Sequence, residues 1–153
     1  MTSTRFAGID DARSRLGQEI GISDWMLIDQ ERVNAFAEVT GDRQWIHVDA
    51  DRARRESPFG APIAHGYLTL SLLAKFAGEC IAVEGIKLAV NYGLNRVRFS
   101  SPVKVGSRVR ARFVLAGVDN IAGGAQMLWQ ATVEIEGAEK PACIAEMVTR
   151  WYF

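Results

Sequence analysis

Apolar residues recur at two different spacings along the chain, and the change divides it into a helical first half and a strand-rich second half. Between Asp29 and Gly41 the spacing is close to that of an α-helix, which predicts an amphipathic helix of about three turns. Its apolar positions are Val33, Phe36, Ala37 and Val39. Gly41 is expected to end this helix as a C-terminal cap.

The next segment, residues 42–62, is polar and contains Pro58 and Pro62, so it is predicted to be mostly loop. Asp49 is placed to cap a short helix that carries three arginines. These are Arg52, Arg54 and Arg55. The arginines form either a solvated face or a phosphate site, and we favour the solvated face.

Residues 65–83 are apolar nearly all round and lack the β-branched residues of a strand, which predicts a buried helix. The large apolar side chains are Tyr67, Leu68, Leu70, Leu72, Leu73, Phe76 and Ile81. Burying each contributes roughly 1.5–3 kcal/mol, so their sum is comparable to the net stability of a domain. We therefore expect this helix to form the centre of the core.

After Gly85 the apolar period changes to two, which predicts four strands over residues 88–99, 107–118, 125–137 and 142–153. In the third, five apolar residues share one face: Met127, Trp129, Ala131, Val133 and Ile135. Short turn sequences join the strands, so consecutive strands are expected to pair antiparallel. The prediction is an α+β domain in which a curled antiparallel sheet wraps around a central helix.

The composition narrows the possible functions. The 153 residues suit a single domain spanning 1–153, and Lys plus Arg equals Asp plus Glu at 18 each, so no charge excess favours nucleic acid. The longest apolar stretch is interrupted by His65, Lys75 and Glu79, and the N-terminus has no signal-peptide core. A cytoplasmic protein without a membrane span is therefore expected. Cys80 and Cys143 lack zinc-ligand spacing and are predicted to be buried, reduced thiols.

The candidate chemistry lies just before the predicted central helix. Asp42 precedes His47 by five residues, and a carboxylate and an imidazole on one loop can converge on one water, although each can also serve as a cap. His65 fits a helix-start residue, and Gly66 would expose an N–H at the helix start as an oxyanion hole. Three nearby side chains stay unassigned. Trp45 is core or pocket wall, and Arg96 and Arg98 face solvent or a ligand.

Three segments of the chain together resemble a known family. These are FAEVTGDRQWIHVDADRAR, then FGAPIAHGYLTLSLL, then NRVRFSSPVKVGSRVRAR. In this order they are similar to the motifs of the MaoC-like, (R)-specific enoyl-CoA hydratases, especially the mycobacterial-type and nodulation-protein-N-like members. The resemblance is strong over residues 30–112 and continues as a strand pattern to Phe153.

The resemblance implies a hotdog fold, a homodimer, and hydration of trans-2-enoyl-CoA to (R)-3-hydroxyacyl-CoA or the reverse dehydration. The family's catalytic Asp and His fall on Asp42 and His47, and its oxyanion N–H falls on Gly66. The chain departs from the family motif at Gln44 and Trp45, where Asn and Pro are usual, without changing the interval from Asp to His. No metal or redox cofactor is implied, because the thioester supplies the activation.

Other functions remain open beside this one. A dehydratase acting on acyl-carrier-protein thioesters would use the same residues, and a non-catalytic acyl-thioester-binding module would keep the fold alone. A hotdog thioesterase would require water to attack the carbonyl carbon instead of C3. The expected meander leaves an open sheet edge, which is a second reason to expect a dimer.

Overall fold

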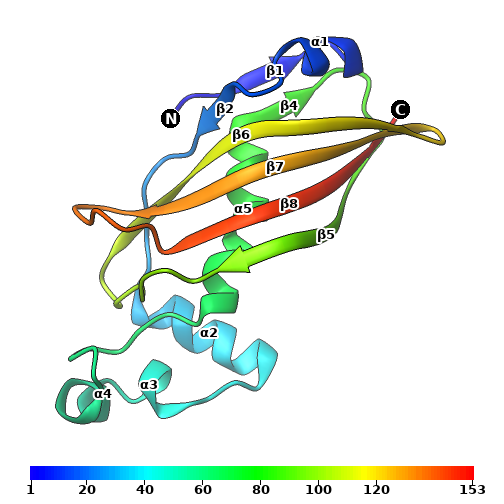
Figure 1. Cartoon of the computed structure of the whole chain (residues 1–153). Helices are drawn as coiled ribbons and strands as arrows, with labels where there is room; N and C mark the ends of the chain where they lie inside the picture. The colour runs from blue at the N-terminus through cyan, green and yellow to red at the C-terminus, as the bar shows by residue number, and fades with distance from the viewer.

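The computed structural model describes residues 1–153 as one curved sheet with a long helix against its concave face (Figure 1). The helices are α1 (Ile9–Ser14), α2 (Gln30–Thr40), α3 (Trp45–Val48), α4 (Ala50–Glu56) and α5 (Gly66–Cys80). The strands are β1 (Thr4–Phe6), β2 (Glu19–Ile22), β3 (Met26–Leu27), β4 (Ile81–Val83), β5 (Leu88–Arg98), β6 (Arg108–Ile121), β7 (Gly124–Ile135) and β8 (Cys143–Tyr152). The main sheet has the order β2-β6-β7-β8-β5, with β3 also paired to β6, and its strands pair antiparallel.

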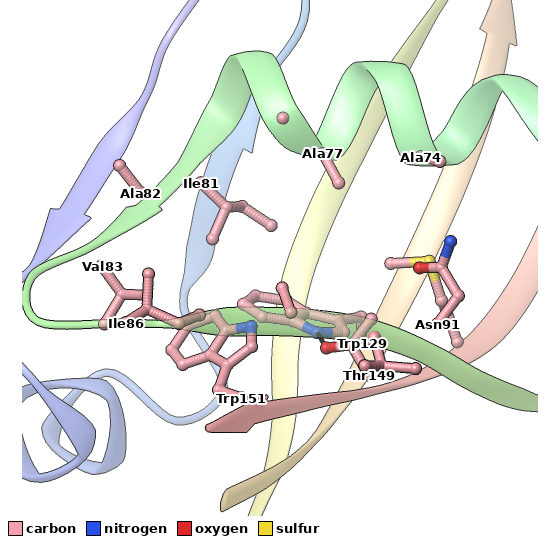
Figure 2. Close-up of a pocket in the computed structure, with 14 residues that line it drawn as sticks. Ala74, Ala77, Ile81, Ala82, Val83, Ile86, Asn91, Trp129, Thr149 and Trp151 are labelled. Carbon is pink, nitrogen blue, oxygen red and sulfur yellow. Dashed lines mark hydrogen bonds between the residues drawn. The ribbon is translucent and has the colours of Figure 1, made fainter. Parts of the chain in front are cut away.

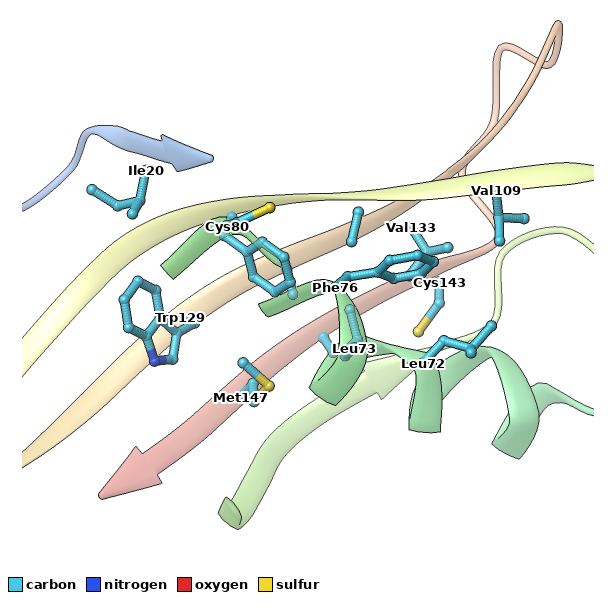
Figure 3. Packing of buried hydrophobic residues seen from close by; sticks show 14 of the residues in the cluster. Ile20, Leu72, Leu73, Phe76, Cys80, Val109, Trp129, Val133, Cys143 and Met147 are labelled. Carbon is cyan, nitrogen blue, oxygen red and sulfur yellow. The ribbon is translucent and has the colours of Figure 1, made fainter. Parts of the chain in front are cut away.

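The core lies between α5 and the concave face of the sheet (Figure 3). Leu73 and Phe76 of α5 are buried against strand residues that include Trp129 and Val133. Alternate residues of β7 and β8 point toward α5, as the period of two predicted, so every second side chain enters the core. The expected curved sheet around a central helix is therefore confirmed, and the sheet does not close into a barrel.

The structure corrects three expectations about the central elements. Strand β5 pairs with β8 and not with its sequence neighbour β6. The connection between them bonds to residues 62–64, and β6 enters the sheet on the far side of β7 and β8. Helix α5 ends at Cys80, and residues 81–83 form β4, which pairs with β1 in a separate two-stranded sheet. One side of α5 is uncovered, so Tyr67 is exposed.

Helix α2 follows its predicted limits closely. The Asp29 carboxylate accepts a hydrogen bond from Arg32 N at 2.9 Å, and Gly41 ends the helix in the left-handed region at φ 78°. Val33 and Ala37 are buried, whereas Val39 is 87% exposed, contrary to the predicted apolar face. Asp49 caps α4 as predicted, through a 3.0 Å hydrogen bond from Arg52 N.

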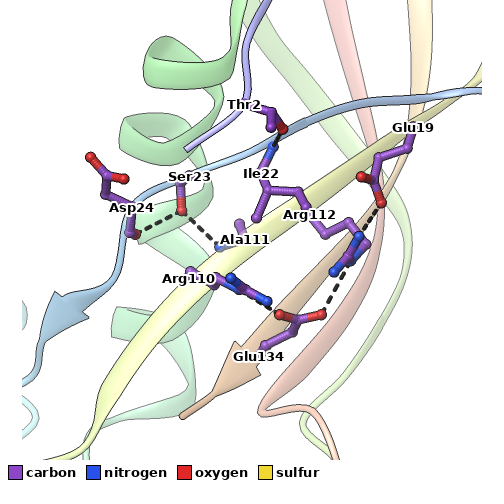
Figure 4. Close-up of polar contacts among 9 residues, drawn as sticks. All are labelled: Thr2, Glu19, Ile22, Ser23, Asp24, Arg110, Ala111, Arg112 and Glu134. Carbon is purple, nitrogen blue, oxygen red and sulfur yellow. Dashed lines mark hydrogen bonds and ion pairs between the residues drawn. The ribbon is translucent and has the colours of Figure 1, made fainter.

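The N-terminal elements were not anticipated from the sequence. Strand β2 pairs with β6, and Ser23 Oγ accepts a hydrogen bond from Ala111 N at 2.9 Å (Figure 4). On the outer face of the sheet Glu134 pairs with Arg110 and Arg112. These contacts fix the edge of the sheet that lies farthest from β5.

Two further expectations concern the cysteines and the membrane. Cys80 and Cys143 are free and buried, and burial raises the pKa of each thiol to about 11, so neither is a reactive thiolate at neutral pH. None of the five helices combines the length and the apolar character that crossing a lipid bilayer requires.

Candidate active site

Helices α2, α3 and α4 form a small unit at the N-terminal end of α5, beyond the edge of the sheet (Figure 1). Gly41 ends α2 and turns the chain, so that Asp42 begins the connection to α3. His47 lies on α3, a single helical turn where a loop was predicted, and this turn directs its side chain inward. Asp42 is exposed and His47 is only 6% exposed, so the pair spans the boundary between solvent and core.

Residues 42–47 and residues 63–66 are joined by three hydrogen bonds. His47 Nδ1 lies 2.7 Å from Ile63 O, and His65 Nε2 lies 2.9 Å from Asp42 O. The backbone adds a bond from Ile63 N to Ile46 O at 3.0 Å. Each segment thus supplies one histidine that bonds to the backbone of the other segment.

A third segment holds residues 63 and 64 from the opposite side. Ala64 N donates to Val103 O at 2.8 Å, and Ile63 forms an antiparallel bridge with Lys104. The three segments that carry the motifs in the sequence therefore meet at the start of α5. Their contacts place the site at one end of the helix and not along its length.

The hydrogen bond to Ile63 fixes the tautomer of His47. A carbonyl oxygen only accepts, so Nδ1 carries the proton and Nε2 keeps its lone pair. Burial lowers the pKa of His47, and the neighbouring His65 lowers it further, whereas the bond to Ile63 and the Asp42 carboxylate oppose the shift. The net effect favours a neutral imidazole, which can accept a proton through Nε2.

Asp42, His47 and His65 form one cluster. A carboxylate oxygen of Asp42 and one nitrogen of each histidine all lie within 4.8 Å of one another. Two polar atoms at that separation can both bond to a single water at about 2.8 Å from each. The carboxylate is held only weakly, by a 3.4 Å hydrogen bond from Gln44 N, and so remains available to a water or a substrate.

The same three residues have a separation that a cation could use, but the ring geometry is unsuitable. The His47 and His65 rings stack with centroids 3.8 Å apart and planes at 23°. A metal binds in the plane of an imidazole, and stacked rings hold their lone pairs in two separate, nearly parallel planes, so one ion cannot lie in both. The arrangement therefore suits hydrogen bonding to water better than metal coordination.

Gly66 is the first residue of α5, as predicted, so its N–H has no acceptor within the helix. A Cβ at this position would lie 3.0 Å from two ring carbons of Phe99, so a larger residue would require the Phe99 ring to shift. A cavity of about 320 Å³ lies beside Gly66, and its wall includes Thr69 and Pro102. A ligand carbonyl in this cavity would lie near the positive end of the α5 dipole.

A second cavity lies away from the pair Asp42 and His47, which we call the dyad, along the uncovered side of α5. It has a volume of about 450 Å³, and an adjoining cavity of about 240 Å³ lies nearer the start of α5. The two share Ala74, Asn91 and Met147, and we call them together the α5–β5 groove. Figure 2 shows Ala74 and Ala77 on one side of this groove and the Trp129 and Trp151 rings on the other.

The remaining candidates are placed outside the cluster. Arg52 and Arg54 pair with acidic residues of their own helix, which agrees with a solvated face. Trp45 is half-buried and outside the hydrophobic core, and its ring lies under the Arg52 guanidinium at 4.3 Å. Arg96 and Arg98 lie on β5 with exposed side chains.

Two residues near the dyad were not recognised from the sequence. His65 occupies the N-cap position of α5, as predicted for a helix-start residue, but its side chain makes no cap hydrogen bond and belongs to the cluster instead. Gln30 was not considered, although its Nε2 donates to His47 O at 2.7 Å. Its partner lies 17 residues away, beyond α2 and the connection to α3, a separation for which the sequence carries no local signal.

Comparison with known proteins gives consistent results. The family described as "MaoC like domain" matches residues 11–137. A 3-hydroxyacyl-thioester dehydratase Z of Mycobacterium tuberculosis is 51% identical over 95% of this chain and 97% of its own length. Nodulation protein N of Rhizobium leguminosarum bv. viciae is 50% identical over 91% of this chain and 88% of its own length.

Solved structures support the same fold. An (R)-hydratase from Pseudomonas aeruginosa in the unliganded form aligns with a TM-score of 0.70 at 23% identity, covering 90% of this chain and 81% of the other. A monoamine oxidase regulatory protein from Archaeoglobus aligns with a TM-score of 0.77 at 20% identity, covering 99% and 97%. At this level of identity the structural likeness concerns the fold.

Proposed function

Because this chain belongs to the family of MaoC-like dehydratases, we propose that it is an (R)-specific hydro-lyase that interconverts trans-2-enoyl-CoA and (R)-3-hydroxyacyl-CoA. The observation that carries the proposal is the hydrogen bond from His47 Nδ1 to Ile63 O. It leaves Nε2 of a neutral imidazole free to act as a base beside the Asp42 carboxylate. The unoccupied N–H of Gly66 lies one residue from His65 and completes a site for an activated carbonyl.

The proposed reaction adds the elements of one water across C2 and C3. Nε2 of His47 accepts a proton from a water that Asp42 also holds, while the water oxygen forms its bond to C3. The displaced electron pair moves toward the thioester oxygen, where the Gly66 N–H and the α5 dipole stabilise the negative charge. The dyad then returns a proton to C2, and dehydration is the same sequence reversed.

The α5–β5 groove supports a thioester with an apolar acyl chain. Its lining is predominantly hydrophobic, and the small residues Ala74, Ala77 and Gly78 leave it open along α5. Ala77 lies eleven residues beyond Gly66, a distance of about 16 Å at the helical rise of 1.5 Å per residue. With C–C bonds of about 1.5 Å, an extended chain on the order of a dozen carbons would span this distance.

We also propose a homodimer formed through β5. This strand is at the edge of the main sheet, is eleven residues long, and is exposed on both faces. Its exposed apolar side chains are Leu88, Val90, Tyr92 and Leu94. Such an edge is normally paired or covered, and antiparallel pairing of β5 with β5 of a second copy would satisfy it by two-fold symmetry.

The direct test is turnover by purified protein of trans-2-enoyl-CoA thioesters of several acyl-chain lengths. The loss of the enoyl absorbance monitors the reaction. An (R) alcohol product is expected, and chiral analysis decides it. The same acyl groups attached to acyl carrier protein test the alternative function, a dehydratase that acts on acyl-carrier-protein thioesters. That enzyme would use the same residues, so only the substrate carrier distinguishes the two. Tight thioester binding without turnover on either carrier would favour a non-catalytic binding module and refute the hydro-lyase proposal.

A further inference from the structure

We propose that His65 is a positioning residue, which holds the loop that carries Asp42 in place and orients the His47 ring for catalysis. This inference rests on the proposed function and deepens it, because it adds a third side chain to the dyad. His65 touches the dyad through two separate contacts. Neither contact belongs to the helix start that the sequence suggested for it.

The first contact is the hydrogen bond from His65 Nε2 to Asp42 O at 2.9 Å. Asp42 follows the last residue of α2 by two positions and is exposed, so few other contacts fix its backbone. Its own N–H makes only a 3.4 Å hydrogen bond to Thr40 Oγ1. The bond from His65 is therefore the shortest polar contact that holds the Asp42 backbone.

The second contact is the stack of the His65 ring on the His47 ring, at 3.8 Å between centroids. Phe36 of α2 packs on His65 at 5.0 Å, which confines the ring on another side. His47 is thus oriented at its edge by Ile63 O and on its face by His65. These two constraints act in different directions and together fix where Nε2 points.

The burial of His65 is difficult to explain by packing alone. The residue is 2% exposed, and its Nδ1 is buried without a hydrogen-bond partner. Burying a polar atom without a partner is unfavourable, and an apolar side chain of similar size would avoid this penalty. A histidine at this position is therefore better explained by what Nε2 and the ring face do for the dyad.

The two histidines should hold opposite tautomers. His65 donates from Nε2 to a carbonyl, and His47 donates from Nδ1 to a carbonyl. Two-bond 1H–15N correlations of the imidazole rings at pH 8 would therefore show Nε2–H for His65 and Nδ1–H for His47. An Nδ1–H tautomer at His65 would overturn the proposal whether or not the protein is active on any thioester.

Two substitutions separate the hydrogen bond from the stack. His65→Phe keeps a planar ring against His47 but cannot donate to Asp42 O, and His65→Gln keeps an N–H donor near the Nε2 position without the ring. Because small misplacements of catalytic groups cost up to about 10²-fold, we expect His65→Phe to lower kcat roughly 10- to 100-fold with KM changed less. His65→Gln should recover part of this loss.

Leu72→Met serves as the matched control, because it changes a buried side chain of the same helix outside the cluster. Circular dichroism and melting temperature of all three variants monitor the fold. A His65→Phe variant that is folded and turns over like wild type would overturn the positioning role. The role would also be overturned if His65→Phe and His65→Gln lost equal amounts of turnover in proportion to their lowered melting temperatures. That result would indicate that His65 affects only the stability of the fold.

Failure of the proposed function would look different. If wild-type protein turned over no enoyl or hydroxyacyl thioester, the kinetic comparison would have no baseline, and the tautomer measurement would still decide the role assigned to His65. If wild type were active and the tautomers were as expected, the kinetics would decide whether the bond to Asp42 O affects turnover.

Discussion

His47 and His65 stack face to face, with ring centroids 3.8 Å apart and planes inclined by 23°. Two imidazoles in this arrangement cannot easily both carry a positive charge, because like charges at short range disfavour each other. The neighbour thus helps to keep His47 neutral, in addition to the effect of burial.

Asp42→Asn and His47→Gln should each lower turnover roughly 10²- to 10⁴-fold, the usual range for a general acid–base group. The double variant should lose little more than the worse single variant, because residues that act on one water are not additive. Steady-state rates of the three variants test this. Asp49→Asn is the matched control, since it changes a nearby carboxylate that only caps α4. If the fold-losses in turnover of the two single variants multiply in the double variant, Asp42 and His47 act in two independent steps.

Activity should depend on pH through His47. Burial lowers its pKa below the usual 6.5, so the neutral base persists to lower pH than for an ordinary histidine. The acid limb of kcat/KM is therefore expected below pH 6.5, measured from pH 4.5 to 8 with a folding check at each point. A limb above pH 6.5 would show that His47 is not the titrating base or is not buried as described.

The lowered pKa of His47 also affects the stability of the fold. The unfolded chain binds a proton at His47 more readily than the folded chain, so the free energy of unfolding should fall as pH drops below 6.5 toward the lower folded pKa. In His47→Gln this contribution is absent. Urea denaturation of both proteins at pH 8 and pH 5.5 should show a smaller pH dependence for the variant.

Filling the α5–β5 groove should shorten the accepted acyl chain. A side chain at Gly78 would enter open space, since a Cβ there meets no atom within 4 Å, and Ala77 lines the same cavity. Gly78→Leu and Ala77→Phe are expected to lower kcat/KM at least about tenfold for chains on the order of twelve carbons, and much less for four-carbon chains.

Lys75→Leu is the control for the groove. It adds an apolar side chain to the same helix at an exposed position that does not line either cavity. Equal losses for short and long chains in the groove variants would mean that the acyl chain lies elsewhere.

A charge on the edge strand should break the proposed dimer. Val90→Lys or Leu94→Lys places a charged side chain on β5, where a second copy would pair. Light scattering at micromolar concentration should show a dimer for wild type and a monomer for these variants. Val39→Lys, at an exposed apolar position on α2, should remain dimeric. A monomeric wild-type protein would contradict the assembly.

The sequence by itself determined the elements whose periods are strong and whose ends carry local signals. Asp29 and Gly41 marked the limits of α2, and the alternation of apolar residues predicted the strands β6, β7 and β8 and the buried face of β7. The motifs around Asp42, His47 and Gly66 also marked the segments that meet at the start of α5. These features depend on neighbours in the chain, which a sequence displays directly.

Only the tertiary structure decided how distant segments meet. The pairing of β5 with β8, the exposure of Val39, and the bond between His65 and Asp42 O each join or separate residues far apart in the chain. A histidine before a helix looks the same in sequence whether it caps that helix or holds a loop 23 residues away. The role of such a side chain depends on the atoms that folding places around it, and those atoms come from other elements.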